Sequence, residues 1–374
     1  MDSAALYSKL RAARHGDLSQ LRPPHGPLAR LATVQGFDTL LWSKLCQSNT
    51  HRELTNRLEE QVMLEVARAG LRQQTARDIC ERFAASGIRC VLLKGSAFAY
   101  TLYEKPWHRP SADVDVLVSA ADAQGAYELL RSSHTPAVQM TGRLVSYQQS
   151  FSDPAQPLAP DIDLHWRLSN TQLFAHSYEF EELWAERIPL PEISSSAFGL
   201  SDTHALLHAC MHRAGHRRAP LYFEGQSLPA VDRLIWLEDI ERLWIRLATD
   251  ARFVVGPEAQ ARGIAAVVLD AISAALQDTP AEGANRHFGL MRADLEPDRS
   301  AVLLSGNPLR GFMSDLAALS TWADRIQLIR DHTLPDRNYM AARYRTQSTT
   351  ELLLAYARRL LGGLMKQARA SVRL

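Results

Sequence analysis

Three short segments that are typical of β-strands constrain the fold of this chain more than any other feature. They are 88–95 (IRCVLLKG), 113–118 (DVDVLV) and 161–168 (DIDLHWRL). The first is a continuous apolar run, which indicates a buried strand, whereas the other two alternate with the period of two of a strand. A further alternating segment, 143–151 (RLVSYQQSF), lies between them. Because helical patterns separate and flank these segments, we expect an α/β core with a small mixed sheet.

The helical patterns divide the chain into three parts. Apolar residues recur at helical spacing before Gly87, a suitable C-terminal glycine, and again between the predicted strands. Helices dominate the remainder, apart from a looser stretch at 277–310. The clearest helical patterns there are 203–217, 228–248, 260–276 and 349–372. We therefore predict an N-terminal helical segment at 1–85, an α/β core at 86–190 and a C-terminal helical domain at 191–374.

Composition and charge narrow the class of protein. Lys plus Arg is 42 and Asp plus Glu is 41, so the net charge is +1 and gives no strong signal for a nucleic-acid partner. The start lacks a secretory apolar region and no apolar run approaches membrane-spanning length, so we expect a cytoplasmic protein with no membrane span. The four cysteines form no C-x-x-C pair and are expected to be buried free thiols.

Two aspartates in the second strand segment need a positive partner. Asp113 and Asp115 are two residues apart in DVDVLV, so a strand directs both side chains to the same face. Two carboxylates at about 4 Å repel by about 4 kcal/mol at an effective dielectric constant of 20, so one takes up a proton or a cation bridges them. Carboxylate oxygens suit Mg²⁺. Taken alone, the pair favours a solvated strand end with two exposed acids over a metal site.

The segment before these aspartates ends in a turn that suits an anion. After the first predicted strand, Lys94, Gly95 and Ser96 lead into a predicted helix at 96–103. A strand-to-helix turn offers backbone N–H groups and a helix N-terminus to a phosphate. Gly95 permits close approach, Ser96 adds a hydroxyl and Lys94 a cation, although an ordinary turn with Ser96 as the N-cap has the same sequence.

The third strand segment adds further acidic groups. Asp161, Asp163 and His165 alternate along one face of DIDLHW. If this strand lies beside the 113–118 strand, a third carboxylate reaches the place where metal ions would bind. Three acids that hold two cations about 3.5–4 Å apart are typical of in-line displacement at phosphorus.

Together these motifs resemble the nucleotidyltransferase superfamily typified by DNA polymerase beta. The resemblance sharpens to an uncharacterised nucleotidyltransferase family, whose core is similar to LLKGSAFAYTLY, RPSADVDVLV and DIDLHWRL, followed by LLHACMHRAGHR and LIWLEDIERL. It extends from about residue 35 to the C-terminus. Sixteen residues separate Ser96 from Asp113, more than is usual in the superfamily, and a loop insertion at YEKPWHRP accounts for the difference.

The resemblance implies Mg²⁺-dependent transfer of a nucleoside monophosphate from an NTP, with ATP expected, to an acceptor, with release of pyrophosphate. It implies that Gly95 and Ser96 hold the triphosphate. Asp113 and Asp115 would bind two Mg²⁺ ions, for which Mn²⁺ is an alternative, and Asp163 would bind the ion that activates the acceptor hydroxyl.

Two assignments stay open at this point. Asp161 competes with Asp163 for the third acidic position, because a strand directs both side chains to one face. Lys94 and Arg109 are candidate phosphate contacts, and Arg109 is equally suited to neutralise the aspartates as a surface partner.

The acceptor is open as well. The near-zero charge favours a hydroxyl of a small molecule, sugar, peptide or protein over a long nucleic acid. One alternative is a nucleotide-binding or regulatory protein without catalysis. Another is a toxin-like enzyme that modifies tRNA or a protein, and a basic groove at 213–218 would favour its tRNA version.

The helices after the core add polar candidates. Four histidines recur at four-residue spacing on one predicted helix: His204, His208, His212 and His216. No nearby carboxylate or cysteine completes a tetrahedral set, so zinc is not expected. The family resemblance implies that His212 and His216 line the cleft. In the following helix we expect Trp236 and Ile240 in the core and Asp239 in a buried salt bridge.

Overall fold

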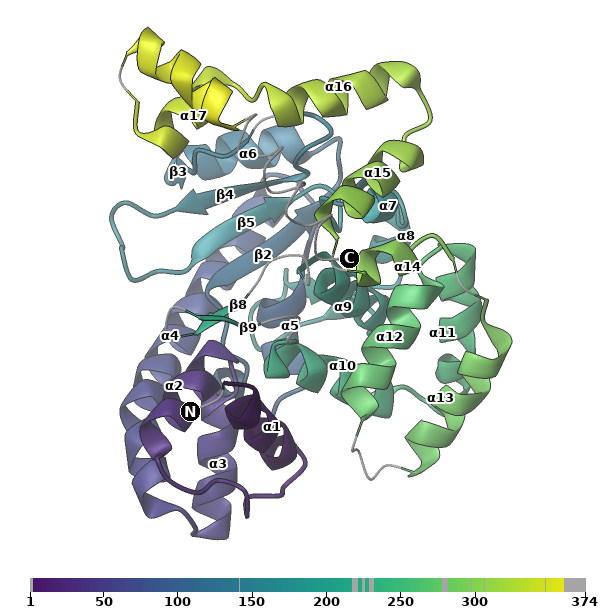
Figure 1. The fold of residues 1–374 in the computed structure, drawn as a ribbon. Coiled ribbons are helices and arrows are strands. Elements are labelled where there is room, and N and C mark those ends of the chain that lie inside the picture. Colours follow the sequence, from purple (N-terminus) through teal and green to yellow (C-terminus); the bar gives the residue numbers. More distant parts are fainter. Residues whose placement is uncertain are drawn as a thin grey trace.

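A seven-stranded mixed sheet carries the segments singled out above (Figure 1). The computed structural model describes residues 3–140, 142–216, 221–223, 226–228, 232–277, 282–296, 298–305, 307–346 and 348–359. The strands are β1 (Cys90–Leu92), β2 (Asp113–Val118), β3 (Thr135–Pro136), β4 (Gln148–Ser152), β5 (Asp161–His165), β6 (Ile188–Pro189) and β7 (Phe198–Gly199). Their spatial order is β3-β4-β5-β2-β1-β7-β6. The predicted α/β core with a mixed sheet is confirmed.

The pairing of β2 with β5 positions the acidic motifs. These two strands are parallel neighbours, with Asp113 opposite Asp161 and Asp115 opposite Asp163. β1 pairs with β2 in antiparallel orientation and with β7 in parallel. The apolar residues of β2 and β5 point into the core and are buried, as the alternation predicted. The expected contact between the two acidic strands is therefore confirmed.

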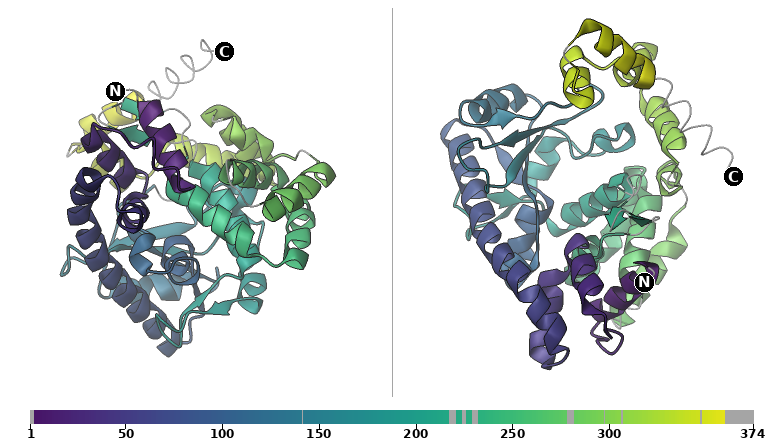
Figure 2. Two further views of the ribbon diagram at one scale, coloured as in Figure 1. Left: turned by 90° about the horizontal axis from the view of Figure 1, so that it is seen from below. Right: turned by 60° about the vertical axis from the view of Figure 1, so that its left-hand side comes forward.

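Helices cover the sheet and flank it on two sides (Figures 1 and 2). The N-terminal ones are α1 (Ser3–Arg14), α2 (His25–Val34), α3 (Asp38–Ser48) and the long α4 (Arg52–Ala85), which packs against β1 and β2. Within the core lie α5 (Lys94–Thr101), the short 3₁₀ helix η1 (Pro106–His108), α6 (Ala123–Arg131), α7 (Gln172–Ala175) and α8 (Phe180–Ala185).

The C-terminal part is mainly helical, as expected. It contains α9 (Asp202–His216), the hairpin β8 (Leu221–Phe223) and β9 (Gln226–Leu228), α10 (Leu234–Arg246), α11 (Thr249–Ala261), α12 (Ala265–Leu276), α13 (Glu282–Asp294), α14 (Ala301–Leu304), α15 (Pro308–Ala318), α16 (Trp322–Thr333) and α17 (Arg337–Tyr344). Residues 349–359 are also helical, and the rest of the predicted tail helix lies outside the described residues.

One hydrophobic core joins the three predicted parts of the chain. It includes Leu6 of α1, Val116 of β2 and Trp244 of α10. Two smaller clusters lie beyond it, one of which packs Leu144 against Leu328 of α16. Because the core is continuous, the boundaries at 85 and 190 stay a prediction about the organisation of the chain.

Several local expectations differ from the structure. The segment 143–151 becomes a strand only from Gln148, because a turn precedes it. The helical pattern 260–276 is divided at Gly263, whose φ of +66° ends α11 before α12 begins. The stretch at 277–310 contains helices among its described residues. Cys46 is exposed, so the expectation of buried thiols is wrong for it, whereas the other three cysteines are buried.

Candidate active site

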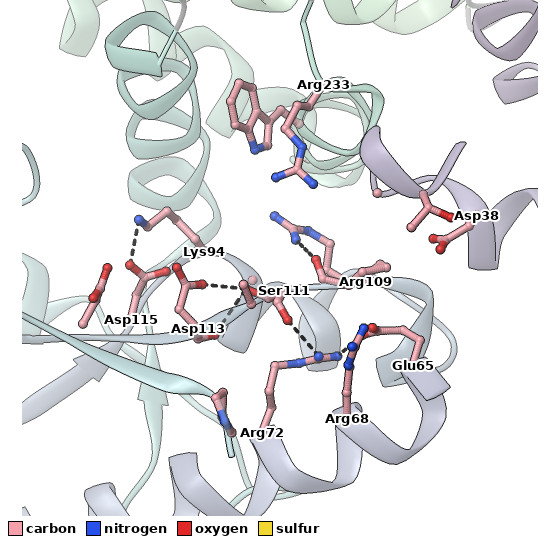
Figure 3. A pocket seen from close by; sticks show the side chains of 18 of the residues that line it. Asp38, Glu65, Arg68, Arg72, Lys94, Arg109, Ser111, Asp113, Asp115 and Arg233 are labelled. Carbon is pink, nitrogen blue, oxygen red and sulfur yellow. Dashed lines mark hydrogen bonds and ion pairs between the residues drawn. The ribbon is translucent and has the colours of Figure 1, made fainter. Parts of the chain in front are cut away.

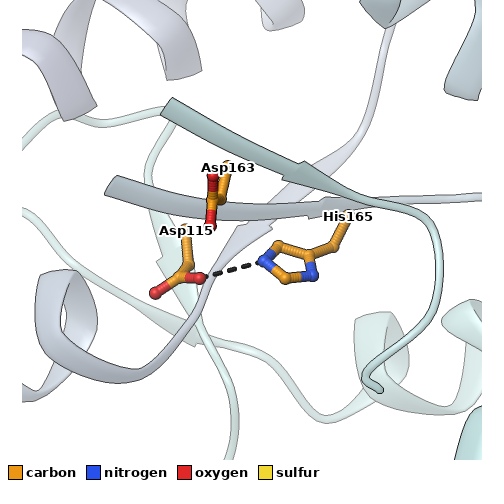
Figure 4. Close-up of side chains that lie close together, drawn as sticks. All are labelled: Asp115, Asp163 and His165. Atoms are coloured by element: carbon orange, nitrogen blue, oxygen red, sulfur yellow. Dashed lines mark hydrogen bonds and ion pairs between the residues drawn. The ribbon is translucent and has the colours of Figure 1, made fainter. Parts of the chain in front are cut away.

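The site begins with Asp115, the more buried of the two β2 aspartates. Its side chain accepts a hydrogen bond from His165 at 2.9 Å and forms an ion pair with the Lys94 ammonium at 2.8 Å (Figures 3 and 4). Burial disfavours its charged form, but the Lys94 cation and the His165 contact outweigh burial and hold the pKa of Asp115 below its usual range. The positive partner that the sequence demanded is, for this carboxylate, a lysine.

Asp113 has a different environment two residues earlier. Its Oδ1 accepts a hydrogen bond from Ser111 Oγ at 2.8 Å. Burial and the neighbouring Asp115 charge raise the pKa of Asp113, and Lys94 counteracts them only in part. The two aspartates on one face thus have pKa values shifted in opposite directions, as expected for a carboxylate pair with too little positive charge nearby.

β5 brings the third carboxylate to the same face. Asp163 accepts hydrogen bonds from Ser150 Oγ at 2.5 Å and from Gln148 at 3.4 Å, both on β4. Asp163 lines the cavity described below, whereas Asp161 is exposed at the start of β5 and is absent from the cavity wall. Of the two candidates for the third acidic position, Asp163 is therefore the one that lies at the cavity.

The turn into α5 forms the adjoining wall. Lys94 has a φ of 43°, a left-handed conformation that turns the chain sharply after β1. A Cβ atom on Gly95 would lie 2.8 Å from Ser111 Oγ and 2.9 Å from Ser111 Cβ, so only glycine fits there. Ser96 does not line the cavity, and its buried hydroxyl has no hydrogen-bond partner among the described residues.

Arg109 lies at the cavity wall but is buried and ion-paired. Its Nε and Nη2 donate to the two carboxylate oxygens of Asp239 at 2.8 and 2.7 Å. Tyr103 adds a third hydrogen bond to the same carboxylate at 2.7 Å. The expected buried salt bridge of Asp239 is confirmed, and its partner is Arg109, which therefore does not act as a surface partner of the β2 aspartates.

These groups surround a cavity of about 750 Å³ (Figure 3). Asp113, Asp115 and Asp163 lie on one wall, with Lys94 and Gly95 beside them. The remaining wall comes from α2, α3, α4, the β4–β5 loop, α9 and α10. A volume of this size accommodates a nucleotide-sized ligand.

Two histidines of the α9 row reach this cavity, as the family resemblance implied. His212 and His216 line it, while His204 and His208 do not. Trp236 of α10 also lines it and packs against both of those histidines at ring-centroid distances of 5.2 and 5.4 Å. Trp236 packs against the main hydrophobic core, as expected, and its partly buried side chain also borders the cavity.

The proposed basic groove at 213–218 is not supported by Arg213, the described arginine of this segment. Arg213 is buried and pairs with Asp232 at 2.7 Å and Asp270 at 2.5 Å. Arg217 and Arg218 lie outside the described residues.

The donor set fits a divalent metal. Ligand atoms of Asp115, Asp163 and His165 lie within 4.8 Å of one another, and Asp113 adds a carboxylate at the same cavity (Figure 4). Carboxylate oxygens are the ligands that Mg²⁺ and Mn²⁺ prefer, and an imidazole is compatible with Mn²⁺. Burial and the neighbouring Asp115 charge raise the pKa of Asp113, and a bound cation would stabilise its charged form.

Sequence reasoning missed the contribution of the N-terminal helices and of Arg233. Gln61, Glu65, Arg68 and Arg72 of α4 line the cavity opposite the acidic strands. Their helical spacing of three and four residues was visible, but that spacing is equally typical of a solvated helix face. Only the packing of α4 along the sheet brings them to the site.

Comparisons with known proteins agree with this arrangement. Among the described residues, no helix has both the length and the apolar character needed to cross a membrane. A search of curated proteins found no match. Residues 25–275, about two thirds of the chain, match a protein family described as uncharacterised nucleotidyltransferase. That range contains β1, β2, β5 and the acidic residues they carry. The chain therefore belongs to the uncharacterised nucleotidyltransferase family.

Proposed function

We propose that this protein is a metal-dependent nucleotidyltransferase. It moves a nucleoside monophosphate from an NTP, with ATP the expected donor, to a hydroxyl of a small molecule, sugar, peptide or protein. One observation carries the proposal: Asp113, Asp115 and Asp163, from two paired parallel strands, face one cavity beside the Gly95 turn. Family membership supports the same reaction class.

The three aspartates are the proposed metal ligands. They would hold two Mg²⁺ ions, or Mn²⁺, which neutralise charge on the phosphates and activate the acceptor hydroxyl. His165 donates to Asp115 and fixes the orientation of that carboxylate. Asp163 is the carboxylate assigned to the acceptor side, because Asp161 is exposed away from the cavity wall.

The Gly95 turn is the proposed triphosphate site. The backbone at Gly95 would contact the phosphates, with Lys94 and Arg109 as cationic neighbours. The sequence-based assignment of the Ser96 hydroxyl to the same phosphates would require a movement of the turn, because that hydroxyl is buried away from the cavity. Lys94 is already within 2.8 Å of Asp115, so it can exchange this carboxylate for a phosphate oxygen when a metal ion takes its place. In the reaction, the acceptor oxygen bonds to the α-phosphorus while the bond to the bridging oxygen breaks and pyrophosphate leaves.

Incubation of the protein with each α-labelled NTP, Mg²⁺ or Mn²⁺ and a cell lysate tests the proposal. A labelled adduct identifies both the nucleotide and the class of acceptor. Asp113→Asn, Asp115→Asn and Asp163→Asn should each lower transfer by at least about a hundredfold. Asp161→Asn is the matched control on the same strand, since its side chain is exposed, and it should keep most of the activity.

Two results would contradict the proposal. One is transfer that survives in both Asp113→Asn and Asp115→Asn. The other is the absence of label incorporation under every condition while nucleotide binding persists, which would favour a binding or regulatory protein. If the labelled acceptor were tRNA, the toxin-like alternative would replace the expected small-molecule or protein acceptor.

A further inference from the structure

Arg233, the residue that precedes α10, faces the cavity and has no carboxylate in direct contact among the residues that the structure describes. Arg233 lines the cavity, and Figure 3 shows its guanidinium directed toward Arg109. With the residues that the structure describes, Arg233 forms no ion pair, and its buried Nε has no hydrogen-bond partner. An unpaired, partly buried cation is costly unless a ligand supplies the missing anion.

The neighbouring arginines of the cavity wall make the contrast clear. Arg109 is neutralised by Asp239 at 2.7 Å. Arg72 is neutralised by Glu65 at 2.5 Å and also donates to the Ser111 carbonyl at 2.9 Å. Burial lowers the pKa of Arg233 and the nearby Arg109 cation lowers it further, while the more distant carboxylates of Asp113, Asp239 and Asp38 counteract them only in part. Arg109 and Arg72 therefore have a carboxylate in direct contact, whereas among the described residues Arg233 has none and is available to a ligand. Arg68, the other arginine of the wall, is exposed to solvent.

Arg233 is also held in place. Its guanidinium lies over the ring of Trp236 at 5.7 Å from the centroid, within the range of a cation–π contact. The chain that follows it is tied to α2, because Gln35 Oε1 accepts from Leu234 N at 3.0 Å and Gln35 O accepts from Ile235 N at 3.3 Å. A cation fixed in this way loses little conformational freedom when an anion binds.

The position of Arg233 indicates which anion it meets. It faces Arg109, and a Cβ atom built on Gly95 would lie 3.4 Å from Arg109 Nη1, so Arg109 lies between the Gly95 turn and Arg233. The acidic residues lie on the adjoining wall. A chain of phosphates that began at the acids would continue past Gly95 toward these guanidinium groups, whose planar fork matches phosphate oxygens.

We propose that Arg233 binds the phosphate chain of the NTP on the side of the pyrophosphate leaving group. This inference rests on the proposed function, because it names a residue for the substrate of that site. As the α-phosphorus bond to the bridging oxygen breaks, negative charge grows on the pyrophosphate, and Arg233 stabilises it. The residue comes from the C-terminal helical part, so this part completes the substrate site.

Inorganic triphosphate is the decisive probe, since it reports on phosphate binding without any choice of base. Its affinity and that of ATP are measured by titration calorimetry in the presence of Mg²⁺, with the full-length protein and the variants Arg233→Gln and Arg233→Lys. The matched control is Arg52→Gln, an exposed arginine of α4 outside the cavity. Circular dichroism melting checks that each variant is folded.

Arg233→Gln should weaken both ligands by the same factor, about tenfold to a hundredfold, as expected for hydrogen bonds to a charged group. Arg233→Lys should recover part of this loss, and Arg52→Gln should bind like the unmodified protein. Unchanged triphosphate affinity in folded Arg233→Gln would overturn the inference and leave the proposed function standing. Failure of the unmodified protein to bind either ligand would overturn both. Arg233-dependent triphosphate binding without any nucleotide transfer would support the inference and contradict the proposed function.

Discussion

The ion pair between Arg109 and Asp239 ties the loop before β2 to α10, and its removal should destabilise the protein strongly. The side chains are 7% and 3% exposed, so water screens their attraction very little. In Asp239→Asn the Arg109 cation would stay buried without a compensating charge, and Tyr103 would lose a charged acceptor. Breaking one partner of a buried pair costs about 3–5 kcal/mol.

This free energy converts into a melting temperature. An unfolding entropy of about 2.1 cal/mol/K per residue gives, over 374 residues, about 0.8 kcal/mol/K. The loss therefore corresponds to a drop of roughly 4–6 °C in the Tm measured by differential scanning calorimetry. The matched control is Glu128→Gln, which breaks the exposed pair with Arg131 and should change the Tm by about 1 °C or less.

A double variant sharpens the experiment. Arg109→Met with Asp239→Leu leaves no unpaired charge, so it should melt above Asp239→Asn. The reasoning would be refuted if Asp239→Asn lowered the Tm no more than Glu128→Gln. It would also be refuted if the loss of Tm in the double variant equalled the sum of the losses in Arg109→Met and in Asp239→Leu, because the two side chains would then contribute independently.

Three further predictions concern the site and its surroundings. Gly95→Ala should lower the free energy of unfolding, measured with urea, by about 1–3 kcal/mol, because the new Cβ would overlap Ser111. Gly70→Ala is the control: no atom lies within 4 Å of its Cβ position, so it should be neutral or stabilising. Burial lowers the pKa of His208 to about 3, so below about pH 6.5 the unfolded chain binds a proton that the folded chain refuses. Between pH 6.5 and 3, His208 should therefore lower the free energy of unfolding by about 1.4 kcal/mol for each unit that the pH falls. In His208→Gln, the free energy of unfolding measured with urea should depend less steeply on pH. Lys94→Met should raise the affinity for Mn²⁺ by about tenfold, because the ion would no longer have to displace the ion pair between Lys94 and Asp115. Electron paramagnetic resonance measures this affinity, and weaker Mn²⁺ binding would contradict the assignment of the aspartates as ligands.

The acidic face was predictable because strand geometry is local. The alternation in DVDVLV and DIDLHW requires apolar residues on one side and Asp113, Asp115, Asp163 and His165 on the other, whatever the rest of the chain does. The same holds for the helices of the N-terminal and C-terminal parts, whose periodicity is contained in the sequence. Turns were less predictable, as the late start of β4 illustrates, because hydrogen bonds to neighbouring strands decide where a strand begins.

The partners of these residues depend on packing between distant segments. Lys94 neutralises Asp115 only because β1 lies beside β2, and Arg109 meets Asp239 across 130 residues of sequence. Trp236 has an apolar side chain that suits both a core and a cavity wall, and only the packing of α10 shows that it contacts the two together.

The α/β class, the acidic faces of two strands and the glycine turn follow from local sequence patterns, because backbone periodicity and the conformational freedom of glycine act within a few residues. The packing of distant segments places Asp163 rather than Asp161 at the cavity wall and pairs Arg109 with Asp239. Among the described residues, it also leaves Arg233 without an ion pair. These features could not be read from the sequence, because register, burial and charge pairing are properties of surfaces brought together from separate parts of the chain.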